Sequence, residues 1–113
     1  SSYYITQCVE KHLSRLLQMG MTAIICSHDL IANAVMVQCQ QLGYHIPQDI
    51  SIIGFDDLPM CAYTSPPLTT IRQDRTELGK CGYYALDSIL NNVSIGTILL
   101  HAQLIERNST GKI

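Results

Sequence analysis

Two adjacent carboxylates, Asp56 and Asp57, follow a short apolar run and are the side chains best placed to do chemistry. The run from Ile50 to Phe55 is rich in β-branched residues, which is typical of a strand buried on both faces of a parallel sheet. Ligands of open α/β sheets bind at the carboxyl ends of the strands, where an ionised carboxylate accepts strong hydrogen bonds from hydroxyl or ring N–H groups. We therefore predict that Asp56 binds a ligand; the alternative is that it caps a turn.

Asp57 and Gly54 have different expected roles. Successive side chains of an extended chain point to opposite faces, so Asp57 is expected to face away from Asp56 and to serve as a cap or hinge. Gly54 lacks a Cβ and allows another backbone or a ligand to come close to the end of the strand.

No residue set predicts catalysis, a bound metal or a cofactor. Ser27, His28, Asp29 and Asp56 are residue types used in acyl transfer, but the chain has no Gly-x-Ser-x-Gly turn. Asp56 and Asp57 are not expected to flank a substrate as paired hydrolytic carboxylates, because they face opposite ways. No dinucleotide or Walker phosphate loop occurs, and the histidines have no metal-ligand spacing with the cysteines. We predict that the protein is not an enzyme.

The elements that would position these residues alternate between helix and strand. The pattern predicts, in order, helix 4–19, strand 22–27, helix 29–42, strand 50–55, strand 68–72, helix 75–92 and strand-like segments 98–100 and 103–106. This order is typical of an open α/β fold with a parallel sheet flanked by helices. We expect Asp29 to cap the second helix, Gly43 to end it, and Asp74 to open a capping box with Glu77 on the third.

The amino-acid composition limits the classes of function that this chain can have. The chain has 113 residues, of which 47% are hydrophobic and 14% charged, and its net charge is −2. The apolar excess fits either a surface that expects a partner or a small domain with a buried sheet. The scattered Lys and Arg residues make this chain alone a poor nucleic-acid binder, and no apolar run reaches the ~20 residues needed to cross a membrane. We expect no signal peptide, and five cysteines without a Cys-x-x-Cys motif indicate a reducing cytoplasm.

An ordered set of short motifs carries a resemblance to a known family. The motifs are Gly20-Met-Thr-Ala-Ile24, Ser27-His-Asp-Leu-Ile-Ala32, Leu42-Gly-Tyr-His-Ile-Pro-Gln-Asp-Ile-Ser-Ile-Ile-Gly-Phe-Asp-Asp57, Pro67-Leu-Thr-Thr-Ile-Arg-Gln-Asp74, Glu77-Leu-Gly79 and Leu104-Ile-Glu-Arg-Asn-Ser-Thr110. From about Met21 to Thr110, the chain resembles the carboxyl-terminal half of the effector-binding region of the lactose-repressor/galactose-repressor family of bacterial transcription regulators.

The resemblance implies one subdomain of a periplasmic-binding-protein-like fold, as a fragment of a longer protein. Residues 1–68 would form the C-terminal effector-binding subdomain, and residues 69–99 would belong to the N-terminal subdomain. Residues 100–113 would return to the C-terminal subdomain. It also implies that Asp56, the first Asp after Gly-Phe, contacts the effector. His28 departs from the family pattern, which often has a ligand-contacting Asn there. An imidazole can still donate or accept one hydrogen bond, so we keep His28 as a candidate ligand contact.

The resemblance further implies partners. The effector would be a sugar or sugar phosphate, and the protein would be a cytoplasmic repressor that acts as a homodimer. Operator DNA would be bound only through an amino-terminal helix-turn-helix that this sequence does not contain. The expected dimer-interface residues, which could instead cover the sheet's own core, are Asn33, Met36, Val37, Met60 and Tyr63. Two alternatives are a solute-binding protein of a transport system and a small α/β enzyme.

Overall fold

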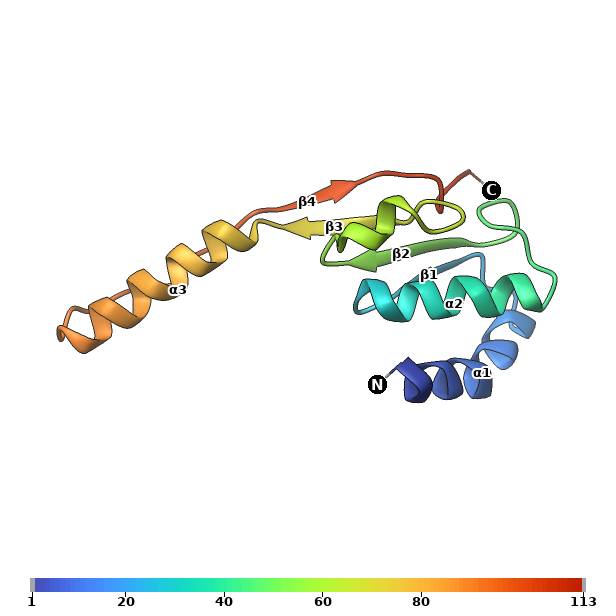
Figure 1. Ribbon diagram of the computed structural model, residues 1–113, viewed down its shortest axis with the longest axis horizontal. Coiled ribbons are helices and arrows are strands. Elements are labelled where there is room, and N and C mark those ends of the chain that lie inside the picture. Colours follow the sequence, from blue (N-terminus) through green and yellow to red (C-terminus); the bar gives the residue numbers. More distant parts are fainter. Residues whose placement is uncertain (1, 113) are drawn as a thin grey trace.

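The computed structural model describes residues 2–112 and contains one mixed sheet with flanking helices (Figure 1). Its elements are α1 (Ser2–Gln18), β1 (Ala23–Ile25), α2 (Asp29–Gln41), β2 (Ser51–Phe55), the 3₁₀ helix η1 (Pro59–Ala62), β3 (Thr69–Gln73), α3 (Arg75–Leu90) and β4 (Ala102–Ile105). The three helices and the strands from β1 to β3 are confirmed to within a few residues. The expected strand over 98–100 is wrong, because that segment has no regular structure.

The sheet has the strand order β1-β2-β3-β4. The predicted parallel arrangement is confirmed for β1, β2 and β3. It is wrong for β4, which pairs antiparallel to β3 with Ile71 opposite Leu104. The physical reason is the path of the chain: β3 leads out to α3, and the chain then runs back alongside β3 rather than crossing over the sheet.

Two predicted helix boundaries are set by local hydrogen bonds. Gly43 has φ +88°, and its amide donates to Gln40 O at 3.0 Å, which closes the end of α2. At the start of α3, Asp74 Oδ1 accepts from the amides of Thr76 at 3.0 Å and Glu77 at 3.1 Å. The cap is therefore confirmed, although the Glu77 carboxylate pairs with a lysine one turn on instead of completing a capping box.

The core lies between the sheet and the two helices α1 and α2. Its buried apolar residues are Leu13, Leu17, Cys26, Ala32, Val35, Met36, Cys39, Ile46, Ile50, Ile52, Cys61 and Leu68. In contrast, α3 projects away from the sheet (Figure 1), and Ser88 is its only buried residue. The chain is accordingly elongated, with a longest extent of 57 Å.

One predicted interface residue lies inside this core. Met36 is 1% exposed, because α2 packs on the sheet through the face that contains it. The prediction that Met36 contacts a partner is therefore wrong. Val37 and Tyr63 are 45% and 88% exposed, and Asn33 and Met60 are half-buried, so these four stay predictions.

Candidate functional site

The backbone turns sharply where β2 ends. Asp56 has φ +103° and Asp57 has φ +52°, and neither is a glycine. Non-glycine residues in such conformations cost on the order of 1–3 kcal/mol each and persist only where the surroundings hold them. Here the Asp56 amide donates to Ile71 O on β3 at 2.8 Å, which fixes the turn against the neighbouring strand. A strained turn at the carboxyl end of a strand marks a candidate site.

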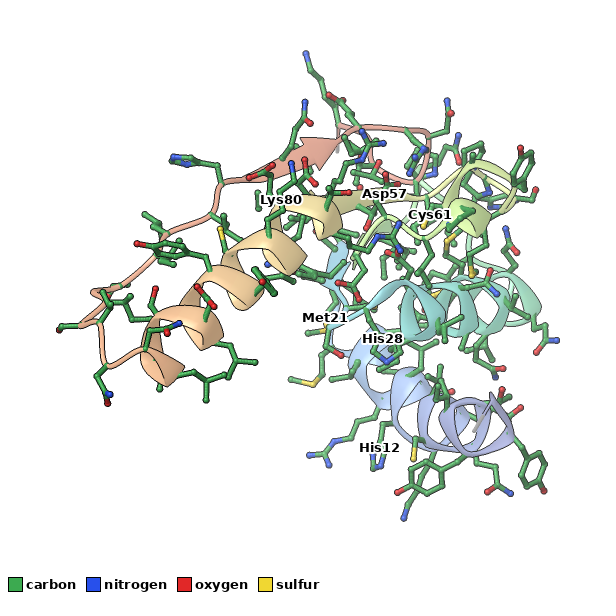
Figure 2. The ribbon with its side chains drawn as sticks, turned by 60° about the vertical axis from the view of Figure 1, so that its left-hand side comes forward. His12, Met21, His28, Asp57, Cys61 and Lys80 are labelled. Atoms are coloured by element: carbon green, nitrogen blue, oxygen red, sulfur yellow. The ribbon has the colours of Figure 1, made fainter. Side chains whose placement is uncertain are left out.

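The Asp56 carboxylate is half-buried and has no hydrogen-bond or ion-pair partner within residues 2–112. His28 follows β1, the strand next to β2, and therefore stands at the same edge of the sheet. It is also half-buried, and Figure 2 shows it where α2 begins. The structure thus places both predicted ligand contacts at one sheet edge, each with unused hydrogen-bonding capacity in the described chain.

Asp29 has a role different from the predicted one. The N-cap position of α2 is His28, and Asp29 is the first helical residue. The Asp29 side chain is fully buried: Oδ1 accepts from Thr70 Oγ1 at 2.6 Å and Oδ2 accepts from Leu58 N at 2.7 Å. The carboxylate bonds to these two donors and not to the amides at the start of α2. The reason is that a buried or partly buried donor loses more free energy without a partner than a helix amide that water can reach. Asp29 therefore joins α2 to β3 and to the loop after β2.

Gly54 makes room for that carboxylate. A Cβ on Gly54 would overlap Asp29 Oδ1 and lie 3.0 Å from the side chain of Leu68. The expected close approach to the strand is confirmed, and the group that approaches is the Asp29 side chain.

Asp57 is held by two arginines that the sequence analysis did not single out. Its Oδ2 accepts from Arg72 Nε at 2.6 Å and lies 2.6 Å from Arg72 Nη2 in an ion pair, and its Oδ1 accepts from Arg107 Nη2 at 2.8 Å. Burial by itself would raise the pKa of Asp57, but the hydrogen bonds and charges of Arg107 and Arg72 outweigh it and hold that pKa below its ordinary value. The only available signal was one basic residue on β3 and another just after β4, and the sequence did not show that these two strands pair.

Burial also shifts the pKa values of three cysteine thiols, and it makes these thiols poor nucleophiles. Burial raises the pKa of Cys26 and of Cys39 to about 11. Burial, with a further contribution from a hydrogen bond to the Asp29 carboxylate, raises the pKa of Cys61 to about 12. These thiols stay protonated at neutral pH. Within residues 2–112 no group of three or more His, Cys, Asp or Glu is arranged to hold a metal ion.

No helix among residues 2–112 has both the length and the apolar character needed to span a membrane.

Comparison with known proteins gives a consistent result. Residues 3–110 match the family described as periplasmic binding protein-like domain. The chain is 37% identical over 107 residues to the HTH-type transcriptional repressor PurR of Aliivibrio salmonicida, a match that covers 91% of this chain and 32% of that protein. The chain therefore spans about a third of the length of this curated relative.

Two solved structures have the same fold. One is the lac repressor dimer bound to operator and the anti-inducer ONPF, with a TM-score of 0.84, 29% identity, and coverage of 97% of this chain and 38% of that one. The other is a LacI family transcriptional regulator from Enterococcus faecium with bound ribose, with a TM-score of 0.82, 31% identity, and coverage of 96% and 41%.

Proposed function

Because the chain belongs to the periplasmic binding protein-like domain family, in the form that LacI-family regulators carry, we propose that it is the effector-binding part of a transcriptional repressor. The effector is a sugar or sugar phosphate, and Asp56 accepts hydrogen bonds from its hydroxyl groups. His28 supplies a further contact from the neighbouring strand end. By this proposal the protein senses a small molecule and performs no chemistry on it.

The observation that carries the proposal is the state of the Asp56 carboxylate. It stands at the carboxyl end of β2 with no partner in residues 2–112. In contrast, four donors are already bonded to the Asp29 and Asp57 carboxylates. A half-buried carboxylate without a partner is costly unless a ligand or water satisfies it. Sugar hydroxyls are suitable donors, and the similar regulator from Enterococcus faecium contains ribose.

Isothermal titration of the protein with D-ribose, ribose 5-phosphate and lactose tests the proposal. We expect one of these probes to bind, and Asp56→Asn to weaken that binding about 10- to 100-fold, because hydrogen bonds to a charged group contribute about 1.5–3 kcal/mol. The matched control is Glu10→Gln, which makes the same charge change at an exposed position on α1 and should leave the affinity unchanged.

Two outcomes would contradict the proposal. Either none of the three probes binds to the unmodified protein, or the affinity is the same in Asp56→Asn. Turnover of a bound probe would instead favour the enzyme alternative.

The wider function follows from the same premise. We propose that residues 69–99 belong to a second subdomain, and that the effector favours one angle between the two, since a ligand shifts an equilibrium only by its differential affinity for the two states. Operator DNA would be bound by a helix-turn-helix outside these 113 residues, and the protein would work in the cytoplasm as a homodimer. The interface would include Asn33, Val37, Met60 and Tyr63. Sedimentation equilibrium tests the dimer: a protein that stays monomeric at micromolar concentration would contradict it.

A further inference from the structure

Asp56 and Asp57 are neighbours in the chain, yet their carboxylates are in opposite states. The Asp57 side chain is 7% exposed, and it accepts one hydrogen bond from, and forms an ion pair with, each of two guanidinium groups. Asp56 accepts none within the described residues. The two arginines thus bond to one carboxylate and leave the carboxylate of the preceding residue unpaired. This difference requires a physical reason, because an arginine and a carboxylate readily form a bidentate pair.

The register of the sheet brings Arg72 close to Asp56. Phe55 on β2 stands opposite Ile71 on β3, and the Asp56 amide donates to Ile71 O. The next residue on β3 is Arg72, whose side chain is 49% exposed and therefore has room to move. The backbones of Arg72 and Asp56 are therefore neighbours across the two strands.

The two arginines differ in how firmly they are held. Besides its bond to Asp57, Arg107 donates from Nη1 to Leu68 O at 2.8 Å, and its side chain is 19% exposed. Arg72 has no side-chain partner other than Asp57 within residues 2–112. Loss of the Asp57 carboxylate would therefore release Arg72 and leave Arg107 anchored.

We propose that Asp57 is a positioning residue that holds Arg72 away from Asp56 and so keeps the Asp56 carboxylate free to bind its ligand. Without Asp57, Arg72 pairs with Asp56 and competes with the ligand for the same oxygens. The ligand part of this inference rests on the proposed function, but the arginine pairing does not.

The binding test uses D-ribose, ribose 5-phosphate and lactose with three variants. Asp57→Asn should weaken binding of the probe by up to about fivefold, because a competing exposed ion pair contributes at most a factor of about five. Adding Arg72→Gln should restore the affinity to near that of the unmodified protein. Arg72→Gln alone should change it little, because Arg72 is already held away. A purely structural role of Asp57 predicts the opposite, with the double variant no better than Asp57→Asn.

A matched control removes a carboxylate from α3, which projects away from the sheet. Glu77→Gln breaks the ion pair with Lys80 on α3, at 3.2 Å, and should leave binding unchanged. Figure 2 shows Lys80 on α3, apart from the strand ends that carry Asp57. Should Asp57→Asn fail to fold, Asp57→Gly replaces it, since glycine adopts φ +52° without strain and still removes the carboxylate.

A second measurement needs no ligand. Hydrogen exchange of the Arg72 Nε–H group, followed by NMR, should stay slow in Asp57→Asn because Asp56 becomes its new acceptor. It should become fast only when Asp56→Asn is added. Fast exchange in Asp57→Asn alone would overturn the inference even if Asp56 binds sugar. An unchanged ligand affinity in Asp56→Asn would overturn the proposed function. In that case the hydrogen exchange of Arg72 Nε–H would still decide whether Arg72 pairs with Asp56 in Asp57→Asn.

Discussion

The body of the protein, residues 22–73, and its arm, residues 74–101, have similar apolar patterns but opposite burial. In the body, Ile50, Ile52 and Leu68 are completely buried. In the arm, Tyr83, Leu90 and Leu99 are between 73% and 79% exposed. Within the arm, α3 is helical because its cap and its residue types favour a helix, whereas the body is folded because its apolar side chains have a second surface to cover. An amphipathic pattern thus predicts a helix but cannot supply the surface that buries it.

The difference also bears on the expected division of the chain. Burial stabilises by about 25 cal/mol for each Å² of apolar surface removed from water, so the exposed apolar side chains of the arm contribute little in this arrangement. This is consistent with the prediction that residues 69–99 pack with a different subdomain, which stays a prediction.

The largest expected contrast is between one apolar side chain of each region. Ile52→Ala should lower the free energy of unfolding by about 4 kcal/mol, because it leaves a cavity in a closely packed core. Leu86→Ala, at a side chain that is 57% exposed, should change it by less than about 0.5 kcal/mol. Urea unfolding followed by circular dichroism measures both. Equal losses would mean that the arm is packed against something in solution.

A second contrast compares two helix-starting aspartates. Asp29→Ala in the body should cost about 3 kcal/mol, because it leaves the buried Thr70 hydroxyl and the partly buried Leu58 amide without an acceptor. Asp74→Ala in the arm should cost about 1 kcal/mol, the usual value of a helix cap. The same unfolding experiment decides; a loss at Asp29 no greater than at Asp74 would contradict the buried role.

A third contrast compares two glycines, at which each single loss of stability is smaller than at Ile52 or Asp29. Gly54→Ala should destabilise the protein by about 2 kcal/mol, because the added methyl group overlaps a carboxylate held by Thr70. Gly82→Ala on α3 meets nothing within 4 Å and should stabilise by up to about 1 kcal/mol through helix propensity. Thermal unfolding of the two variants should therefore show shifts of opposite sign, and shifts of the same sign would refute the comparison.

The features predicted correctly from the sequence depend on residues close together in the chain. The three helices, the cap at Asp74 and the stop at Gly43 follow from spacing and from hydrogen bonds within four residues. The motif order also predicted the family to which residues 3–110 belong. The placement of Asp56 at a strand end followed from the apolar run before it.

The errors concern contacts between distant residues. The helical pattern of α2 did not reveal that Met36 faces the sheet rather than a partner, because several apolar residues lie around that helix. The direction of β4 depended on the return path from α3, which no local signal specifies.

By itself, the sequence determined which segments are helices and strands and which carboxylates stand at the ends of strands, because those properties depend on local spacing and backbone preference. Only the tertiary structure decided what each carboxylate does. Asp29 bonds to Thr70, 41 residues away, and Asp57 bonds to Arg107, 50 residues away. Such pairs form only after the fold has brought distant segments together, so the difference between the occupied Asp57 and the available Asp56 is a property of the folded chain.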